Sequence, residues 1–220
     1  MDRTILTTRR IVSENLPIPI ITHRLIIRSF RPSDLEAYHT LLTQPEAMEG
    51  KNMSPSLEYT QELLNLQQPP YDTEVYLGIF LKKSNENDNH EGELIGDGDN
   101  QEGELIGDGG IYHLRTEGEW PNLSYRFKKE FWNNGYATEF TRGFMEFWRS
   151  LPYESTTLRV RANSVDFVQD MSRVGERVYA SVNINNVASQ KVLEKAEFEL
   201  FDVNMGEMGV THWRKIIFFY

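Results

Sequence analysis

The alternation of apolar and polar positions divides the chain into predicted strands and helices. Short β-branched and aromatic runs, several with the two-residue period of a half-buried strand, indicate strands. These runs are residues 24–30, 74–81, 110–114, 120–127, 156–160, 178–182, 197–203 and 213–219. Helices are indicated where apolar residues recur every three or four positions, in several cases after an early proline or acid. These stretches are residues 32–43, 54–68, 135–149 and 187–195.

An eight-residue segment occurs twice in the chain. Residues 91–98 read Glu-Gly-Glu-Leu-Ile-Gly-Asp-Gly, and residues 102–109 repeat them without a change. Two copies do not form a solenoid, so we interpret them as a local duplication that lengthens a loop, residues 82–103. The second copy runs directly into the apolar residues 110–114, and we predict that it joins that strand and leaves the first copy exposed. Because the copies are identical, either could pair in a sheet.

A short turn joins the predicted strand 120–127 to the helix that follows it. Residues 131–139 of this turn read Phe-Trp-Asn-Asn-Gly-Tyr-Ala-Thr-Glu. The free N–H groups and the dipole of a helix start favour an anion, and a phosphate group suits such a turn best. Gly135 lets the backbone approach a ligand closely, and Ala137 adds only a small side chain.

A polar pair lies at the start of the predicted helix 187–195. Asn186 and Ser189 are three residues apart, so both lie on one face near the helix start. On the residues alone, capping of the helix by these side chains is favoured over a binding role.

The turn resembles the phosphate loop of the GCN5-related N-acetyltransferases, and most of all the branch that contains the ribosomal-protein N-terminal acetyltransferases. The family loop reads Gln/Arg-x-x-Gly-x-Gly/Ala, and in this branch often Trp-Gly-x-Gly-Tyr-Ala-Thr-Glu. Residues 132–139 match the branch pattern, except that Asn133 stands where the branch has glycine. Trp132 stands where the general family has Gln or Arg. Asparagine reaches left-handed conformations more readily than other residues with a side chain.

A second stretch, residues 178–198, resembles the same branch more closely. The branch has a strand, then Asn-x-x-Ser, then Val-Leu/Tyr-Glu-Lys-x-Gly-Phe. Asn186 and Ser189 hold the Asn-x-x-Ser positions, and Glu197 replaces the glycine. The opening Thr22-x-Arg24 is also similar to that of the branch. Motifs in the same order on the same elements are more specific than either motif alone.

The resemblance implies an α/β (α+β) fold with a mixed, mostly antiparallel sheet of six or seven strands. Helices are expected on both faces, and the fourth and fifth strands are expected to splay apart into a cleft. We expect a single acetyltransferase domain over residues 21–220. The preceding residues 1–20 are interpreted as an N-terminal arm, because residues 1–11 are basic and weakly apolar.

The fifth strand has two candidate segments. Only residues 178–182 have the family's spacing to Asn186, so we predict that they form the cleft-side end of this strand. Residues 157–160 are expected to form its beginning or a neighbouring segment. Residues 163–176 are expected to be an insertion near the mouth of the acceptor site, where loops commonly carry function.

The resemblance also implies acetyl-CoA as the acetyl donor and indicates the residues that bind it. Backbone N–H groups near Arg126 and Phe127 are expected to polarise the thioester carbonyl. Lys128 and Lys129 could meet the phosphates or be solvated. The remaining predicted coenzyme-binding residues are Trp132, Asn133, Asn134, Gly135, Tyr136, Ala137, Thr138, Asn186 and Ser189.

Two residues are candidates for acid–base chemistry. In many relatives a tyrosine four residues after the serine position protonates the leaving sulfur; this chain has Leu193 there, so Ser189 or a water molecule would donate that proton. Glu119, just before the fourth strand, is the best carboxylate for a general base, although an acid in a turn is more often only solvated. The five histidines show no metal-ligand spacing, and no metal site is predicted.

Composition narrows the partners. A net charge of −10 argues against nucleic acid or an anionic membrane and suits an amine-bearing substrate. The chain has no cysteine, which excludes an acetyl-cysteine intermediate and fits a reducing, cytoplasmic location. No apolar stretch reaches the length of a membrane span. We expect a monomer or homodimer that acetylates a protein amino terminus or a small-molecule amine. The alternative is a catalytically impaired CoA-binding or protein-interaction module of the same fold, which Asn133, Leu193 and Glu197 motivate.

Overall fold

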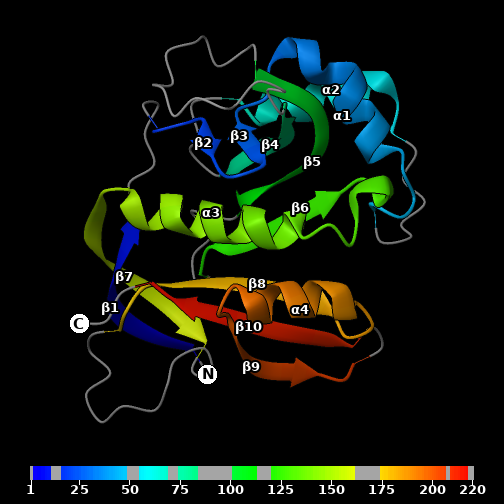
Figure 1. The fold of residues 1–220 in the computed structure, drawn as a ribbon. Coiled ribbons are helices and arrows are strands. Elements are labelled where there is room, and N and C mark those ends of the chain that lie inside the picture. The colour runs from blue at the N-terminus through cyan, green and yellow to red at the C-terminus, as the bar shows by residue number, and fades with distance from the viewer. Residues whose placement is uncertain are drawn as a thin grey trace.

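The computed structural model describes residues 2–10, 16–48, 55–68, 74–83, 101–112, 120–161, 174–206 and 209–217. Its main feature is an eight-stranded sheet (Figure 1). In spatial order the strands are β2 (Ile20–Ile21), β3 (Leu25–Arg28), β4 (Val75–Lys82), β5 (Glu102–Tyr112), β6 (Asn122–Phe127), β8 (Arg177–Asn183), β10 (Val210–Ile216) and β9 (Glu199–Asn204). Neighbouring strands are antiparallel except for the parallel pair β6 and β8.

The predicted mixed, mostly antiparallel sheet is therefore confirmed, but it has eight strands and not six or seven. The additional strand is β2, which pairs with β3 through Ile20 and Ile21. A strand of two residues is too short to show a period, so the sequence pattern did not predict a strand at this position.

Helices cover both faces of the sheet, as predicted (Figure 1). On one face lie α1 (Leu35–Leu42), which follows the 3-10 turn η1 (Pro32–Asp34), and α2 (Leu57–Leu66); on the other lie α3 (Tyr136–Ser150) and α4 (Val187–Lys195). Alternate strand residues reach the two cores, because successive side chains of a strand point to opposite faces. Leu25 and Ile27 join the α3 side, whereas Ile26 joins the α1 side. Among the described helices, none is long and apolar enough to cross a membrane.

The helix α3 is fixed to the sheet by an aromatic stripe. Phe140, Phe144 and Trp148 recur every four residues and are fully buried. Phe140 meets the rings of Tyr125 and Phe127 on β6 at centroid distances of 6.0 and 6.4 Å. Burial of each such ring contributes roughly 1.5–3 kcal/mol. The start of α3 is thereby held close to the end of β6.

The amino-terminal residues do not form the arm that we expected over residues 1–20. Asp2–Arg10 forms β1, which pairs antiparallel with β7 (Tyr153–Arg161) along all nine residues in a separate two-stranded sheet. Ile5 is buried against Trp120 and Val160 in a small core of its own. The pairing partner lies about 150 positions along the chain, so the local pattern of residues 1–11 could not reveal it.

The second copy of the repeat forms the first part of β5, as predicted. Each of its acids meets a cation: Glu102 accepts from Arg28 at 2.6 Å, Glu104 from Lys128 at 2.7 Å and Asp108 from Arg126 at 2.7 Å. The first copy, residues 91–98, lies outside the described residues.

The residues that follow the two copies differ, and they determine which copy can occupy the β5 position between β4 and β6. A Cβ atom on Gly110 would overlap the carbonyl oxygen of Val75, and Ile111 is fully buried in the core. After the first copy the equivalent residues are Asp99 and Asn100. An exchange would force a side chain against the β4 backbone and bury an amide among apolar groups.

The predicted fifth strand is confirmed in its cleft-side part. Residues 178–182 lie in β8 between β6 and β10. Residues 157–160 lie in β7, which is a neighbouring segment outside the eight-stranded sheet. Of the predicted insertion 163–176, residues 163–173 lie outside the described part of the chain.

Deletion of residues 91–100 is expected to leave the fold intact. The deletion keeps Gln101, whose carbonyl oxygen accepts a hydrogen bond from the Lys83 N–H at 2.7 Å. Shortening a loop changes its closure entropy only slightly. By calorimetry, the melting temperature should shift by less than about 8 °C, which is the most that a change of roughly 1–2 kcal/mol would produce in a chain of this length.

The matched control is Gly110→Asp with Ile111→Asn in the full-length chain, which gives the second copy the residues that follow the first. This variant should be far less stable than the deletion variant. A deletion variant that melts as low as this control would show that the first copy is structural.

Candidate functional site

The candidate site lies where β6 and β8 diverge. These parallel strands pair at a single position, Asn122 with Tyr179, and the Tyr179 N–H donates to the Pro121 carbonyl at 2.8 Å. Along the rest of their lengths β8 pairs with β10 and β6 pairs with β5. The predicted splay between the fourth and fifth strands is thus present, and it leaves a cavity of about 310 Å³. The cavity is lined by Ala47, Met48, Tyr76, Tyr112, Leu123, Ser124, Tyr125, Arg126, Ala180, Ser181, Val182, Asn186, Ser189 and Leu193.

Backbone groups of β6 face this cavity. The Lys128 N–H donates to the Ile106 carbonyl of β5 at 2.9 Å. In an antiparallel pair the direction of the N–H groups alternates, so those of Tyr125 and Phe127 point away from β5 and toward the cleft. The Arg126 N–H points toward β5. Of the two predicted positions, Phe127 therefore has its N–H group on the edge of β6 that faces away from β5, whereas Arg126 is the one that lines the cavity, through its side chain.

Two hydroxyl groups meet inside the cleft. The hydroxyl of Tyr125 is buried and lies close to that of Ser189, without a hydrogen bond of good geometry between them. Burial raises the pKa of Tyr125 to about 12, although the nearby Ser189 lowers it. Leu193 is buried beside them, in the place of the family's tyrosine. From the sequence, Tyr125 was expected either to pack in the core or to line the cleft; its ring packs against the core, and the residue also lines the cavity.

Asn186 caps α4. Its Oδ1 atom accepts a hydrogen bond from the Ser189 backbone N–H at 3.0 Å. The capping role that the residues alone favoured is therefore present, and both side chains also line the cavity. The two roles are compatible, because the cap uses the backbone of Ser189 and leaves its hydroxyl free for the cleft.

The loop before α3 has the backbone shape of a phosphate loop. After the 3-10 turn η3 (Lys129–Phe131), Asn133 and Gly135 adopt left-handed conformations with φ of 61° and 81°, and no side chain caps the start of α3. The Trp132 indole N–H donates to the Phe127 carbonyl at 2.8 Å, which holds the loop against the end of β6. Asn134 Nδ2 donates to the Trp132 carbonyl at 2.9 Å. The predicted residues Trp132–Thr138 are thus brought together at one helix start.

Two substitutions for glycine keep the expected backbone. Among the described residues, the non-glycine residues with positive φ are Asn133 and Glu197, at 61° and 62°. Both occupy positions where the resemblance leads one to expect glycine. The chain therefore retains the left-handed turns without the residue that adopts them most easily.

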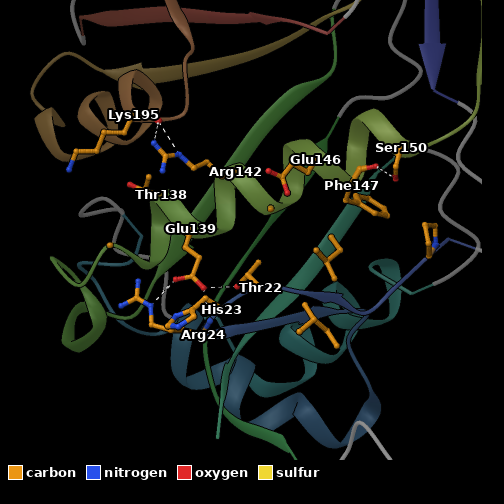
Figure 2. A pocket seen from close by; sticks show the side chains of 15 residues that line it. Thr22, His23, Arg24, Thr138, Glu139, Arg142, Glu146, Phe147, Ser150 and Lys195 are labelled. Atoms are coloured by element: carbon orange, nitrogen blue, oxygen red, sulfur yellow. Dashed lines mark hydrogen bonds and ion pairs between the residues drawn. The ribbon is translucent and has the colours of Figure 1, made fainter. Parts of the chain in front are cut away.

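A set of contacts around Glu139, which we term the Glu139 clasp, joins the amino-terminal segment to this loop (Figure 2). The carboxylate accepts from the Thr22 hydroxyl at 2.6 Å, from the Arg24 backbone N–H at 2.7 Å and from Arg24 Nε at 2.8 Å. Arg24 Nη1 donates to the Asn134 carbonyl at 3.0 Å, and its guanidinium lies over the Tyr136 ring. The clasp borders a groove of about 900 Å³ along α3, where Arg142 Nη2 donates to the Lys195 carbonyl at 2.6 Å.

The clasp also places a positive charge at the loop. A Cβ atom on Gly135 would lie 3.5 Å from Arg24 Nη2. Arg24 is itself paired with Glu139 at 2.8 Å through Nε, but Nη2 of the same guanidinium lies beside the loop. Lys128 and Lys129 are paired at 2.7 Å with Glu104 and Glu46. Sequence reasoning considered the two lysines for the phosphates and missed Arg24. The Thr22-x-Arg24 motif was the sequence signal for Arg24, but the sequence alone did not show that both residues bond to Glu139 beside the loop.

One predicted site residue falls on a part of the chain that the structure does not describe. Glu119 is not among the described residues, so its candidacy as a general base stays a prediction. In the described part of the chain, no group of three or more His, Cys, Asp or Glu side chains could hold a metal ion.

Comparison with known proteins agrees with this geometry. The family model of the acetyltransferase (GNAT) domain matches residues 24–199. A search of curated protein sequences finds no match.

Solved structures of similar fold include a GNAT-family acetyltransferase from Bacillus anthracis, with 17% identity, a TM-score of 0.60 and coverage of 90% of this chain and 98% of that chain. RimL, a ribosomal L7/L12 alpha-N-protein acetyltransferase in complex with coenzyme A, has 16% identity, a TM-score of 0.60 and coverage of 90% and 97%. A spermidine N-acetyltransferase SpeG chimera from Vibrio cholerae and hSSAT has 14% identity, a TM-score of 0.59 and coverage of 88% and 95%. At these identities the likeness concerns the fold.

The Glu139 clasp should make stability depend on pH. Burial raises the pKa of Glu139, but the hydrogen bonds from Thr22 and Arg24 and the charge of Arg24 outweigh this effect and hold the pKa below its usual range. The contribution is therefore present above the unfolded pKa, about 4.3, and is lost as the pH falls through the folded value. Glu139→Gln should lower the melting temperature at pH 7 by about 2–4 °C, or roughly 1 kcal/mol after solvent screening.

The difference between wild type and Glu139→Gln should shrink as the pH falls below the unfolded pKa of about 4.3, and it should disappear once the pH is below the lowered pKa of the folded carboxylate. Glu146→Gln is the matched control, because it removes the same charge from an exposed position of α3. Equal melting temperatures for wild type and Glu139→Gln at pH 7 would contradict a stabilising clasp.

Proposed function

Because the chain belongs to the GNAT acetyltransferase family, we propose that it transfers an acetyl group from acetyl-CoA directly to a primary amine while both substrates are bound. The observation that carries this proposal is the cleft between β6 and β8, together with the loop that Trp132 holds against the end of β6. The first site suits a thioester arm and the second suits a pyrophosphate.

The residues present fit the coenzyme. The first N–H groups of α3 lack a side-chain cap, and Arg24 adds a positive charge beside Gly135, so Trp132–Thr138 and Arg24 would bind the pyrophosphate. The cleft-facing N–H groups of β6 and the Asn186 side chain would bind the amide groups of the pantetheine arm. Acetyl-CoA supplies the thioester whose carbonyl carbon the amine attacks.

The chain's own groups then assist in moving two protons. The amine must be neutral to attack, and Glu119 is the proposed base, directly or through water. The Phe127 N–H stabilises the negative charge that develops on the thioester oxygen. As the carbon–sulfur bond breaks, the Ser189 hydroxyl gives its proton to the sulfur. The chain has no cysteine to carry the acetyl group, and direct transfer relies on holding the two substrates together.

The alternative is a module of the same fold that binds CoA without turnover. Leu193 motivates it, because a proton donor of many relatives is absent at this position. The left-handed conformations of Asn133 and Glu197 show that the substituted turns are retained, which supports coenzyme binding under both proposals. Release of free CoA thiol with a panel of amines tests the proposal; binding of CoA without release on any amine would support the module.

Gly135→Asp is expected to weaken CoA binding about tenfold or more, which corresponds to about 1.4 kcal/mol. The substitution puts a carboxylate at the anion site and a side chain at φ 81°. Calorimetric titration with CoA measures the effect. Ser56→Asp is the control, because it adds the same charge at the start of α2. Equal affinities of Gly135→Asp and wild type would remove the loop from the coenzyme site.

Ser189→Ala is expected to lower kcat about tenfold or more and to leave the affinity for CoA and the melting temperature nearly unchanged. The cap of α4 survives this change because Asn186 bonds to the backbone N–H of residue 189. Tyr125→Phe tests whether the neighbouring hydroxyl contributes to the residual rate. Unchanged kcat in both single variants and in the double variant would exclude the cleft hydroxyl groups from proton transfer.

A further inference from the structure

Among the described residues that line the cavity, Arg126 is the one with a charged side chain. Arg126 and Asp108 are directly opposite each other on β6 and β5. Arg126 Nε and Nη2 donate to the two carboxylate oxygens at 2.7 Å each, and the Asp108 side chain is fully buried. A two-point contact of this kind holds the guanidinium plane in one orientation. The positive group is therefore pre-organised and does not swing in solution.

One edge of this guanidinium remains available to a ligand. Arg126 lines the cavity, and its side chain keeps 23% of its surface exposed. Nη1 donates to the Met48 thioether sulfur at 3.2 Å, and a thioether is a weak acceptor. A carboxylate or carbonyl oxygen in the cavity would be a much stronger partner for the same N–H groups.

Among the residues that the structure describes, the cavity lining has no Asp or Glu to balance a cationic ligand, and the buried Asp108 already pairs with Arg126. The proposed base Glu119 lies outside the described residues and would accept one proton from the reacting amine, not balance several positive charges. An acceptor with several ammonium groups would bring like charge toward the guanidinium in a partly desolvated space. An acceptor with an oxygen near its amine would meet a complementary group.

We propose that Arg126 is a residue that determines acceptor specificity: Nη1 binds a carboxylate or carbonyl oxygen adjacent to the reacting amine. The enzyme accordingly selects amino acids or the amino-terminal residue of a peptide over polyamines. This inference rests on the proposed acetyl transfer to an amine. Arg126 reaches the site from the face of the sheet that carries α1, while Tyr125 faces α3, so its role is separate from that of the coenzyme-binding loop.

The test uses acceptors of similar size. The wild-type protein is assayed with alanine, alaninamide, isopropylamine and spermidine, and kcat/KM is determined for each amine. We expect alanine or alaninamide to exceed isopropylamine and spermidine by tenfold or more, mainly through a lower KM. Preference for alanine would assign the oxygen to a carboxylate, and preference for alaninamide would assign it to a peptide carbonyl.

The variant must not leave a buried charge alone. Arg126→Met by itself would strand the Asp108 carboxylate and could prevent folding. The double variant Asp108→Asn with Arg126→Met removes both charges together. In this variant the preference for oxygen-bearing amines should fall about tenfold or more, while the affinity for CoA stays the same. Comparison of ratios between the two proteins cancels differences in amine basicity.

The matched control is Arg28→Met with Asp34→Asn and Glu102→Gln, because Arg28 pairs with both acids. This cluster is also largely buried, with Arg28 and Asp34 bonded at 2.7 Å, but none of its three residues lines the cavity. It should change stability without changing the ratio between acceptors.

The outcomes of these assays distinguish a failure of the proposed acetyl transfer from a failure of the proposed role of Arg126. A folded wild-type protein that binds CoA and acetylates none of the amines, nor a short peptide, would contradict the proposed function. A wild-type protein that acetylates amines but treats isopropylamine or spermidine as well as alaninamide and alanine would overturn the role of Arg126. The same conclusion follows if the preference is equal in wild type and in the Asp108/Arg126 double variant.

Discussion

The candidate site exists because the adjacent parallel strands β6 and β8 pair at one end only, at Asn122 and Tyr179. Each strand is held on its other edge, β8 by β10 and β6 by β5, so both stay in the sheet while they diverge from each other. Beyond this point the facing edges of β6 and β8 are not paired with each other, so their backbone N–H and C=O groups can bind a ligand. The helix starts of α3 and α4 follow these two strands and therefore face the same opening. Both binding loops and the cavity follow from this one divergence.

The loop is supported from a distant part of the chain. Glu139 bonds to Thr22 and Arg24, which are more than 100 residues away in sequence. The two motifs that resembled the family separately are thus parts of one contact set. Arg24 links the two parts of this contact set, because its Nε donates to the Glu139 carboxylate and its Nη1 donates to the Asn134 carbonyl of the loop. The loop contains two left-handed residues, and its shape is stabilised by the segment with Thr22 and Arg24, which is distant from it in the sequence.

Sequence reasoning predicted the features whose signals are local. The strand, turn and helix around Gly135, the Asn186–Ser189 helix start and the assignment of the second repeat copy to β5 each depend on a few consecutive residues. The pairing of β1 with β7 was missed because it joins segments about 150 residues apart. Arg126 was expected to act through its backbone, but its side chain forms a buried pair whose partner lies on another strand. Periodicity shows which face a residue takes and not which charge it will meet there.

The repeat has a consequence for how this chain folds. Both copies carry the residues that β5 uses up to Gly109, including the acids that pair with Arg28, Lys128 and Arg126. The copies become distinguishable only at Gly110 and Ile111, near the carboxyl end of the strand. If residues 91–98 dock before residues 102–109 during refolding, they can form most of the hydrogen bonds that β5 forms with β4 and β6. Residues 91–98 must then be released before Ile111 can enter the core. We therefore expect the two identical segments to compete for the place of β5 during folding, and we expect the release of residues 91–98 from that place to slow refolding.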